Sequence, residues 1–183
     1  MLALHNVALF ITQIIFSFLI FVVSLRLLLQ FFRAGFNNPI CQFIAKMTNP
    51  VVLPLKNILP RVQWVDLASL AVLFIIEIIK FITLGFLQGI HLGIVPLIFL
   101  SFADMIVQIS DILFFTIIIR VILSWVNPQL HNPLTEILYT ITEPLLQWIR
   151  RFVPALSGFD FSPLVAIVGL KIINIIIMSY LPV

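Results

Sequence analysis

The chain has 183 residues, of which 62% are hydrophobic and 9% are charged, and its mean hydropathy is +1.24. Soluble domains contain roughly 45 to 50% apolar and about 25% charged residues, so this composition excludes a soluble protein and indicates a membrane protein. The formal net charge is +3, but the ten Lys and Arg residues are scattered without a basic run, which is not the pattern of a nucleic-acid-binding surface.

Four apolar stretches, residues 7–32, 67–87, 103–126 and 162–181, are long enough to cross a bilayer. About 20 residues of α-helix span the ~30 Å hydrocarbon layer. Their Ile, Leu, Val and Phe residues lack the alternation of a membrane β-strand. The sequence therefore predicts an all-α membrane protein with four transmembrane helices. The start of the chain lacks the basic region and cleavage site of a secretory signal, so we expect the first stretch to remain as a membrane anchor.

The second half of the chain repeats the first, since an offset of 94 residues aligns Arg26 with Arg120. The same offset aligns Asn38 with Asn132, Thr48 with Thr142, Pro50 with Pro144, Lys56 with Arg150, Pro60 with Pro154 and Asp66 with Asp160. A repeat of this size is a duplicated structural unit. We interpret residues 7–87 as the first repeat, 88–102 as a connector and 103–181 as the second repeat. The apolar connector predicts an interfacial loop, with a longer and tilted third helix as the alternative.

Each repeat contains a proline-rich segment between its two spans, residues 37–61 and 131–155, that is too polar to cross the membrane. Asn132 followed by Pro133 predicts a helix start, and apolar residues then recur at helical spacing in both copies. Pro144 is expected to open a second short helix. Each segment is therefore predicted to form an amphipathic helical hairpin at the membrane surface, with a re-entrant loop as the alternative.

Six of the ten Lys and Arg residues lie in these two segments or just before the first, namely Arg33, Lys46, Lys56, Arg61, Arg150 and Arg151, whereas the connector contributes only His91. Because Lys and Arg in short loops remain on the cytoplasmic side, both hairpins are expected to face the cytoplasm. The two repeats then point the same way and share a pseudo-twofold axis along the membrane normal. The residues expected to contact anionic lipid head groups or partner proteins are Lys46, Lys56, Arg150, Arg151 and Trp148.

Charged residues near the cytoplasmic ends of the spans are functional candidates, because an ionisable group in a bilayer costs several kcal/mol unless it is paired or hydrated. Arg26 and Arg120 lie inside their spans, and Asp66 and Asp160 open the spans that follow. We expect Arg26 to pair with Asp66 and Arg120 with Asp160, or the crossed pairs, through charge-assisted hydrogen bonds. The alternative is that the arginines snorkel and the aspartates begin helices without meeting them.

Glu77, Lys80 and Lys171 lie deeper in the spans. Glu77 and Lys171 are repeat equivalents, which predicts a pair across the axis, and Lys80 is the competing partner of Glu77 on its own helix. Our hypothesis is that such a pair specifies how the helices dock. A proton or cation path through Glu77 and Asp111 is the other interpretation.

The sequence contains no recognisable catalytic, cofactor or metal motif. The single cysteine, Cys41, excludes an intramolecular disulfide and a cysteine-based zinc site, and the three histidines lie in separate segments. A phosphate-binding glycine loop, a zinc-binding His-Glu-x-x-His helix and a nucleophile elbow are all absent from the sequence. We therefore expect no enzyme activity, no cofactor and no metal ion.

Several short runs, most of them in the second repeat, resemble the YggT family of small integral membrane proteins, which includes the YlmG proteins of plastids and cyanobacteria. These runs are Arg120-Val-Ile-Leu-Ser-Trp125, Asn132-Pro133, Glu143-Pro144-Leu-Leu146, Arg150-Arg-Phe-Val-Pro154 and Ser157-Gly-Phe-Asp-Phe-Ser-Pro163. The resemblance covers nearly the whole chain, and the first copy departs from it where Phe31 replaces Trp125 and Asn57 replaces Arg151.

The resemblance implies a multi-pass inner-membrane protein linked to osmotic or salt tolerance and cation uptake, or to cell division and envelope organisation. In plastids it implies roles in nucleoid distribution and in assembly of a membrane cytochrome complex. Two functions follow as expectations. The first is a membrane scaffold or assembly factor whose hairpins bind partner proteins or anionic lipids. The second is a small cation channel or transporter that uses Glu77, Lys80, Asp111 and Lys171.

Overall fold

The computed structural model describes residues 2–35, 37–60, 65–127, 132–153 and 160–180. Within these residues the chain forms helices and no strand. The helices are α1 (Leu2–Phe31), α2 (Pro39–Lys56), α3 (Leu67–Gln88), α4 (Ile94–Val126), α5 (Pro133–Arg150) and α6 (Ser162–Ser179). Of these, α1, α3, α4 and α6 are long and apolar enough to cross a membrane. The predicted all-α membrane fold with four spans is confirmed.

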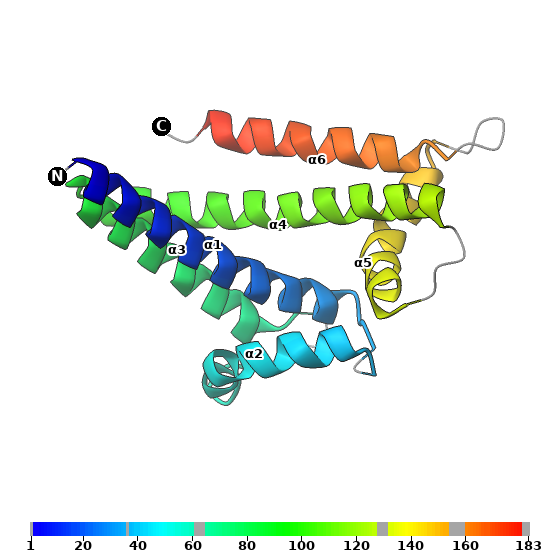
Figure 1. The fold of residues 1–183 in the computed structure, drawn as a ribbon, viewed down its shortest axis with the longest axis horizontal. Helices are drawn as coiled ribbons and strands as arrows, with labels where there is room; N and C mark the ends of the chain where they lie inside the picture. Colours follow the sequence, from blue (N-terminus) through cyan, green and yellow to red (C-terminus); the bar gives the residue numbers. More distant parts are fainter. Residues whose placement is uncertain (1, 36, 61–64, 128–131, 154–159, 181–183) are drawn as a thin grey trace.

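The two repeats have the same orientation. Figure 1 shows the start of α1 and the end of α6 at one end of the bundle, and the end of α1 and the end of α4 at the other. Within each repeat the two spans pack together, as α1 with α3 and α4 with α6, and α4 also packs against α3. In the described part of the chain α1 and α6 do not pack together, so α6 lies at the edge of the bundle beside α4.

The third span is longer than predicted. α4 begins at Ile94 rather than Ala103, so the interfacial loop predicted for the connector is wrong and the longer-helix alternative holds. Gly89 ends α3 in the left-handed conformation (φ 71°), which glycine adopts without steric cost, and the Ile90 amide then donates to the Gly85 carbonyl at 2.8 Å. Pro96 is tolerated because it lies in the first turn of α4, where amides have no helical acceptor.

Each segment between the spans forms one bent helix rather than two short ones. α2 continues through Pro50 and Pro54, and α5 continues through Pro144, so the separate helix predicted from Pro144 is wrong. A proline inside a helix removes one hydrogen bond and displaces the carbonyl four residues earlier, which bends the helix without ending it. Figure 1 shows the change of direction within α2.

Both helices start where the sequence predicts. The Asn38 side chain accepts a hydrogen bond from the Ile40 amide at 2.9 Å, and the Asn132 side chain accepts one from the Thr135 amide at 2.8 Å. Asn38 also links the two repeats, because its side-chain amide donates to the Pro133 carbonyl at 2.7 Å and to Glu136 Oε2 at 2.9 Å. The N-termini of α2 and α5 are therefore held together.

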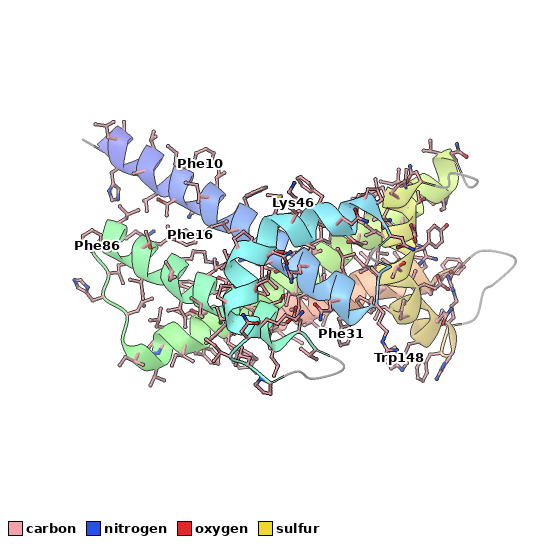
Figure 2. The ribbon with its side chains drawn as sticks, turned by 90° about the horizontal axis from the view of Figure 1, so that it is seen from below. Phe10, Phe16, Phe31, Lys46, Phe86 and Trp148 are labelled. Atoms are coloured by element: carbon pink, nitrogen blue, oxygen red, sulfur yellow. The ribbon has the colours of Figure 1, made fainter. Side chains whose placement is uncertain are left out.

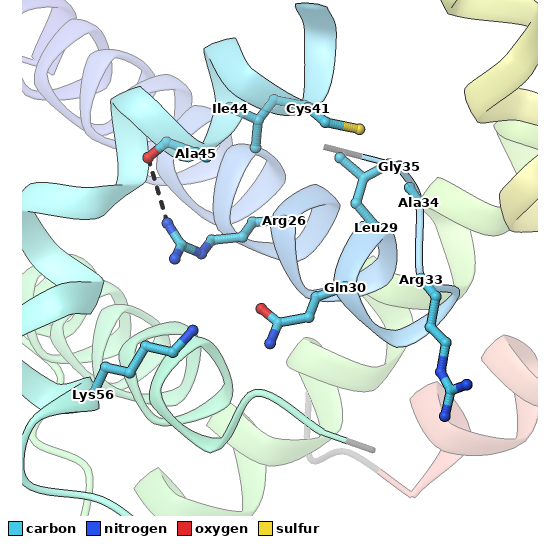
Figure 3. Close-up of a pocket in the computed structure, with 10 residues that line it drawn as sticks. All are labelled: Arg26, Leu29, Gln30, Arg33, Ala34, Gly35, Cys41, Ile44, Ala45 and Lys56. Atoms are coloured by element: carbon cyan, nitrogen blue, oxygen red, sulfur yellow. Dashed lines mark hydrogen bonds between the residues drawn. The ribbon is translucent and has the colours of Figure 1, made fainter. Parts of the chain in front are cut away.

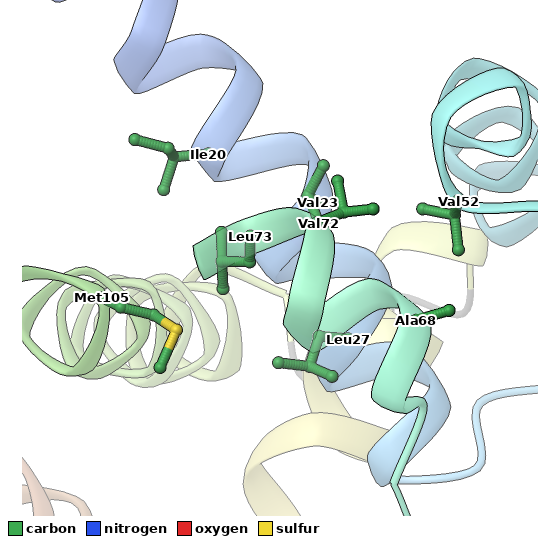
Figure 4. Close-up of a cluster of buried hydrophobic side chains, with 8 residues drawn as sticks. All are labelled: Ile20, Val23, Leu27, Val52, Ala68, Val72, Leu73 and Met105. Carbon is green, nitrogen blue, oxygen red and sulfur yellow. The ribbon is translucent and has the colours of Figure 1, made fainter. Parts of the chain in front are cut away.

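The two repeats use equivalent positions for their cores. The first-repeat core, shown in Figure 4, consists of Ile20, Val23, Leu27, Val52, Ala68, Val72, Leu73 and Met105. Three of these positions recur in the second-repeat core, in which Ile117, Leu146 and Ala166 are the equivalents of Val23, Val52 and Val72. This repeated packing fixes α2 and α5 against the two spans of their own repeats.

A third cluster joins the repeats through α2 and α5 and consists of Leu29, Cys41, Ile44, Ile137 and Ile141. The Cys41 side chain is buried in it, and this burial, together with the nearby Glu136 carboxylate, raises the pKa of the Cys41 thiol. Cys41 is therefore a poor reporter of membrane sidedness, because a thiol reagent reaches it slowly.

Exposed positions on α2 and α5 allow the sidedness of the membrane insertion to be tested. In a Cys41→Ala background, we expect an impermeant maleimide to label Lys46→Cys on α2 and Gln147→Cys on α5 from one side of the membrane, and His5→Cys from the other. Labelling of intact spheroplasts and of inverted vesicles measures this directly. If Lys46→Cys and Gln147→Cys react from opposite sides, the parallel arrangement of the repeats is wrong.

Candidate functional site

The arginine of each first span binds the helix that follows, immediately before its proline bend. Arg26 Nη1 donates to Thr48 Oγ1 at 2.6 Å, and Arg120 Nη1 donates to Thr142 Oγ1 at 2.7 Å. Each threonine hydroxyl in turn donates to the carbonyl four residues earlier, at 2.7 and 2.6 Å respectively. Thr48 and Thr142 are buried, so each guanidinium is held by an oriented hydroxyl out of contact with solvent. We call this pair of contacts the arginine–threonine clamps.

In the second repeat the clamp continues into a chain of alternating charges. Arg120 Nη2 donates to Glu143 Oε2, whose other oxygen accepts from Arg150 Nη1 at 2.7 Å. Arg150 then donates to Asp160 Oδ2 through Nη2 at 2.7 Å and Nε at 2.9 Å. The predicted direct pair between Arg120 and Asp160 is therefore wrong, because Glu143 and Arg150 lie between them.

The first repeat has the same arginine–threonine clamp but lacks the row of alternating charges that follows it in the second repeat. Arg26 Nη1 also donates to the amide oxygen Asn49 Oδ1 at 2.8 Å, and Asn49 is the repeat equivalent of Glu143. Asp66 Oδ2 lies 3.9 Å from Arg26 Nε and 3.7 Å from Lys56 Nζ. The predicted pair of Arg26 and Asp66 is thus an ion pair without the expected hydrogen bond. Asp66 instead caps α3 and accepts from the Ser69 hydroxyl at 2.9 Å.

The environment of the second-repeat chain lowers the pKa of both carboxyl groups. Burial alone raises the pKa of Glu143, but hydrogen bonds and charges from Arg120 and Arg150 outweigh it, so the pKa lies below the ordinary range. Burial likewise acts against hydrogen bonds from Ser162 and Arg150 at Asp160, and the pKa of Asp160 is also lowered. Both carboxylates are therefore ionised at neutral pH and keep the chain intact.

A second group of polar side chains lies halfway along the spans and links α3 to α4. Gln108 Nε2 donates to Glu77 Oε1 and to Asp104 Oδ2, both at 2.9 Å, and Lys80 Nζ contacts both carboxylates. Glu77 and Lys80 are buried. The predicted pair of Glu77 with Lys171 is wrong, and Glu77 pairs with Lys80 on its own helix. The predicted start of this span at Ala103 puts Asp104 at the membrane edge, so the sequence does not predict Asp104 as a partner of Lys80.

The third group links α4 to α6. Asp111 Oδ1 accepts from Lys171 Nζ at 2.8 Å and from Asn174 Nδ2 at 2.9 Å. The side chains of Lys171 and Asp111 are 43% and 37% exposed, although both lie near the middle of helices that span the membrane. The other ion pairs that span residues make within the described chain have side chains that are 30% exposed or less.

A groove of about 460 Å³ lies where the two repeats meet, between α1, α4 and the starts of α2 and α5. Four pairs of repeat equivalents line it, namely Ser17 with Asp111, Phe21 with Phe115, Leu25 with Ile119 and Ile40 with Leu134. Equivalent residues face one space only where the axis that relates the repeats passes through it. The groove therefore marks the pseudo-twofold axis, and Asp111 and Gln108 supply polar groups to its wall.

The residues predicted to meet lipid head groups or partners lie in two settings. Lys46, Arg151 and Trp148 are exposed on α2, at the end of α5 and on α5, and Figure 2 labels Lys46 and Trp148. Lys56 and Arg150 are half-buried beside Asp66 and Asp160. Among the described residues, no three His, Cys, Asp or Glu side chains are grouped as a metal site requires.

Together, the four spans, the duplicated clamp and the two bent helices define a duplicated multi-pass membrane protein. The family model CCB3/YggT matches residues 5–87 and again residues 97–181, and the chain therefore belongs to the CCB3/YggT family. This confirms the resemblance seen in the sequence.

Several relatives are similar over most of their length. An uncharacterized protein of Pseudomonas aeruginosa is 37% identical over 183 residues, which cover 99% of this chain and 93% of the relative. An uncharacterized protein of Vibrio alginolyticus is 38% identical over 90% of each chain. The uncharacterized protein YggT of Escherichia coli is 32% identical over 92% of this chain and 88% of its own. No solved structure shows a significant match.

The clamp predicts a large difference between two neighbouring threonines. Thr142→Val removes the hydroxyl that accepts from the buried Arg120, and a hydrogen bond to a charged group is worth about 1.5 to 3 kcal/mol. We expect a clear fall in the unfolding temperature of the purified protein in detergent, measured by tryptophan fluorescence. Thr140→Val, on the same helix but at its surface, is the control. Equal effects of the two variants contradict the clamp.

The alternating charges Arg120, Glu143, Arg150 and Asp160 predict that the unfolding temperature falls at acidic pH. A carboxyl group with a lowered pKa stabilises the fold above its ordinary pKa, about 4.3 for Glu, and loses this contribution as the pH falls through the folded value. We expect the unfolding temperature to fall with acidification below that range, and to fall less in Glu143→Gln. Glu136 accepts a hydrogen bond from the Asn38 amide rather than from a guanidinium. We therefore expect Glu136→Gln to retain the fall in unfolding temperature at acidic pH. The hypothesis fails if Glu143→Gln retains it too.

Proposed function

We propose that this protein is a membrane scaffold or assembly factor that binds a transmembrane helix of another membrane protein against α4 and α6. The observation that carries the proposal is the exposed Asp111–Lys171 pair in the middle of the spans. Charges at this depth are costly where they face lipid, and they normally face a protein partner or water. A helix with a polar or acidic side chain at the same depth would cover the pair and hydrogen-bond to it.

The first repeat supports this proposal because its equivalent surface is already covered. Lys171 and Asn174 of α6 are the equivalents of Glu77 and Lys80 of α3. Against α3 lies α4, whose Asp104 and Gln108 bond to Glu77 and Lys80 and leave the Lys80 side chain 8% exposed. The corresponding helix of the other repeat, α1, does not reach α6. We infer that a helix from a partner takes that place.

The remaining charges of the spans favour a scaffold over a conduction path. Arg26, Arg120, Glu77 and Lys80 are each bonded within the described chain and fix one helix against another. A scaffold needs such rigid docking and no turnover, so we propose a role without enzymatic activity. As the family resemblance of the sequence implies, this role would serve osmotic adaptation or the organisation of the envelope and division apparatus in the inner membrane.

The α2 and α5 helices extend this role to the membrane surface. We propose that they face the cytoplasm and contact anionic lipid head groups through the exposed Lys46 and Arg151, with Trp148 as an interfacial anchor. Each exposed cation near an anionic leaflet contributes about 1 kcal/mol of attraction. The scaffold would thereby be oriented and held flush with the lipid surface.

A cation channel or transporter is the second candidate, and one observation favours it. Transporters built from repeats bind their substrates near mid-membrane at the interface between the repeats. The groove on the pseudo-twofold axis has this position, and Asp111 and Gln108 line it. The two functions differ in what Asp111 does, since a scaffold uses it to hold Lys171 whereas a transporter uses it to bind a cation.

Photo-crosslinking in native membranes tests the scaffold. With p-benzoylphenylalanine at Ile175, one turn beyond Lys171 and 67% exposed, we expect a discrete adduct to another membrane protein. The adduct should disappear in Lys171→Met, because that variant removes the charge that a polar partner helix recognises. The same photoreactive residue at Ile82, exposed on α3, should give no such adduct.

Ion flux separates the two candidates. Proteoliposomes of the purified protein should show no potassium or sodium flux above protein-free vesicles. Flux that Asp111→Asn or Glu77→Gln abolishes would replace the scaffold with the transporter. An adduct at Ile175 that contains a second copy of this chain would instead assign the surface to self-association.

A further inference from the structure

A basic pocket of about 500 Å³ lies beside the arginine–threonine clamp of the first repeat, where α1 ends and α2 passes over it. Figure 3 shows Arg26, Gln30 and Lys56 around one space, with Leu29 and Ile44 beside them. Arg33 also lines the pocket. Three cationic residues therefore meet one cavity at the level of the last turns of α1, which is where a span reaches the lipid head groups.

The second repeat shows what this arrangement needs. There, the two cations Arg120 and Arg150 are balanced by the two carboxylates Glu143 and Asp160, with Glu143 hydrogen-bonded to both arginines. Among the described residues, the equivalent cations Arg26 and Lys56 of the first repeat have only Asp66 as a carboxylate partner, because Asn49 replaces Glu143. One negative charge present in the second repeat is thus missing from the first.

The hydrogen bonds of the clamp show the same difference atom by atom. Arg120 uses Nη1 for Thr142 and Nη2 for Glu143. Arg26 uses Nη1 for both Thr48 and Asn49, and its Nη2 has no acceptor among the described residues. Lys56 Nζ likewise makes no hydrogen bond to the described chain, and the carboxylate oxygen beside it lies at 3.7 Å. The donors that hold Glu143 in one repeat are available in the other.

We propose that the first-repeat pocket binds a phosphate group, which takes the place that the Glu143 carboxylate occupies in the second repeat. Arg26 Nη2 and the Lys56 ammonium would donate charge-assisted hydrogen bonds to its oxygens, with Gln30 as a neutral contact. The apolar wall formed by Leu29 and Ile44 suits the glycerol region of an anionic phospholipid, and free inorganic phosphate is the other source. Basic pockets between membrane helices hold such head groups elsewhere.

This proposal is independent of the partner helix proposed for α6, because the pocket and the Asp111–Lys171 pair share no residue. It is more specific than a general attraction of cations to an anionic leaflet. General attraction depends on the number of exposed charges and treats Lys46 and Lys56 alike, whereas the pocket depends on which side chains surround it.

The substitution Asn49→Glu provides the test, since it places in the first repeat the carboxylate that the second repeat already accommodates. We expect it to fold normally and to reduce phosphate-group binding at least about tenfold, because its carboxylate competes for the same two cations. Gln42→Glu is the matched control. It also lowers the net charge by one, but Gln42 is exposed on α2 and does not line the pocket.

Two probes are offered to each full-length protein. Native mass spectrometry measures retention of phosphatidylglycerol from mixed phosphatidylglycerol–phosphatidylcholine nanodiscs, and thermal unfolding measures stabilisation by inorganic phosphate in neutral detergent. Loss of phosphatidylglycerol retention in Asn49→Glu but not in Gln42→Glu supports the pocket with a lipid head group as its ligand. The same pattern seen only with inorganic phosphate supports it with a soluble ligand.

The proposal is overturned if Asn49→Glu binds both probes as well as the wild type, or if Gln42→Glu lowers binding as much as Asn49→Glu. A change in the unfolding temperature of ligand-free Asn49→Glu separates misfolding from loss of the site. If Asn49→Glu unfolds at a lower temperature without ligand, Lys56→Gln gives the same test of binding, since Lys56 is half-buried and makes no hydrogen bond to the described chain.

Discussion

The fold depends on satisfying a guanidinium in an apolar setting. Arg26 and Arg120 lie within spans, where an uncompensated charge would cost several kcal/mol. The chain solves this in the same way twice, by bending the next helix at a proline and placing a threonine hydroxyl on the guanidinium just before the bend. The clamp therefore fixes the position of α2 on α1 and of α5 on α4, and the cores of both repeats follow from it.

The spacing of residues predicts much of this arrangement. Hydropathy gives the four spans, the offset of Arg26 and Arg120 gives the repeat, and Asn-Pro gives the starts of α2 and α5. The partners of the charges are not predictable in this way. Arg120 has two candidate partners in its own repeat, Asp160 before α6 and Glu143 beside the bend of α5. The direction in which α5 bends brings Glu143, rather than Asp160, within hydrogen-bond distance of Arg120.

The partners of the charged residues deep in the spans are not predictable for a different reason. Symmetry pairs Glu77 with Lys171, but an exact dyad would require α1 to pack against α6 as α4 packs against α3, and the described chain lacks that contact. α4 supplies Asp104, Gln108 and Asp111 on one side of its helix, and it bonds to α3 and α6 separately. Sequence symmetry predicts the kind of residue at each depth, whereas the packing of α4 decides the partner.

Duplication lets one copy show what the other lacks. The second repeat balances its cations internally through Glu143 and leaves an ion pair exposed on α6, whereas the first repeat covers its deep charges with α4 and leaves cations around a pocket. Each repeat thus satisfies within the described chain the charges that its counterpart leaves exposed or unbalanced. A protein that only needed stability would gain by satisfying both, since unbalanced charge near apolar surface is costly. The two open positions lie at different depths, and they are where a helix and a phosphate group, respectively, would complete the structure.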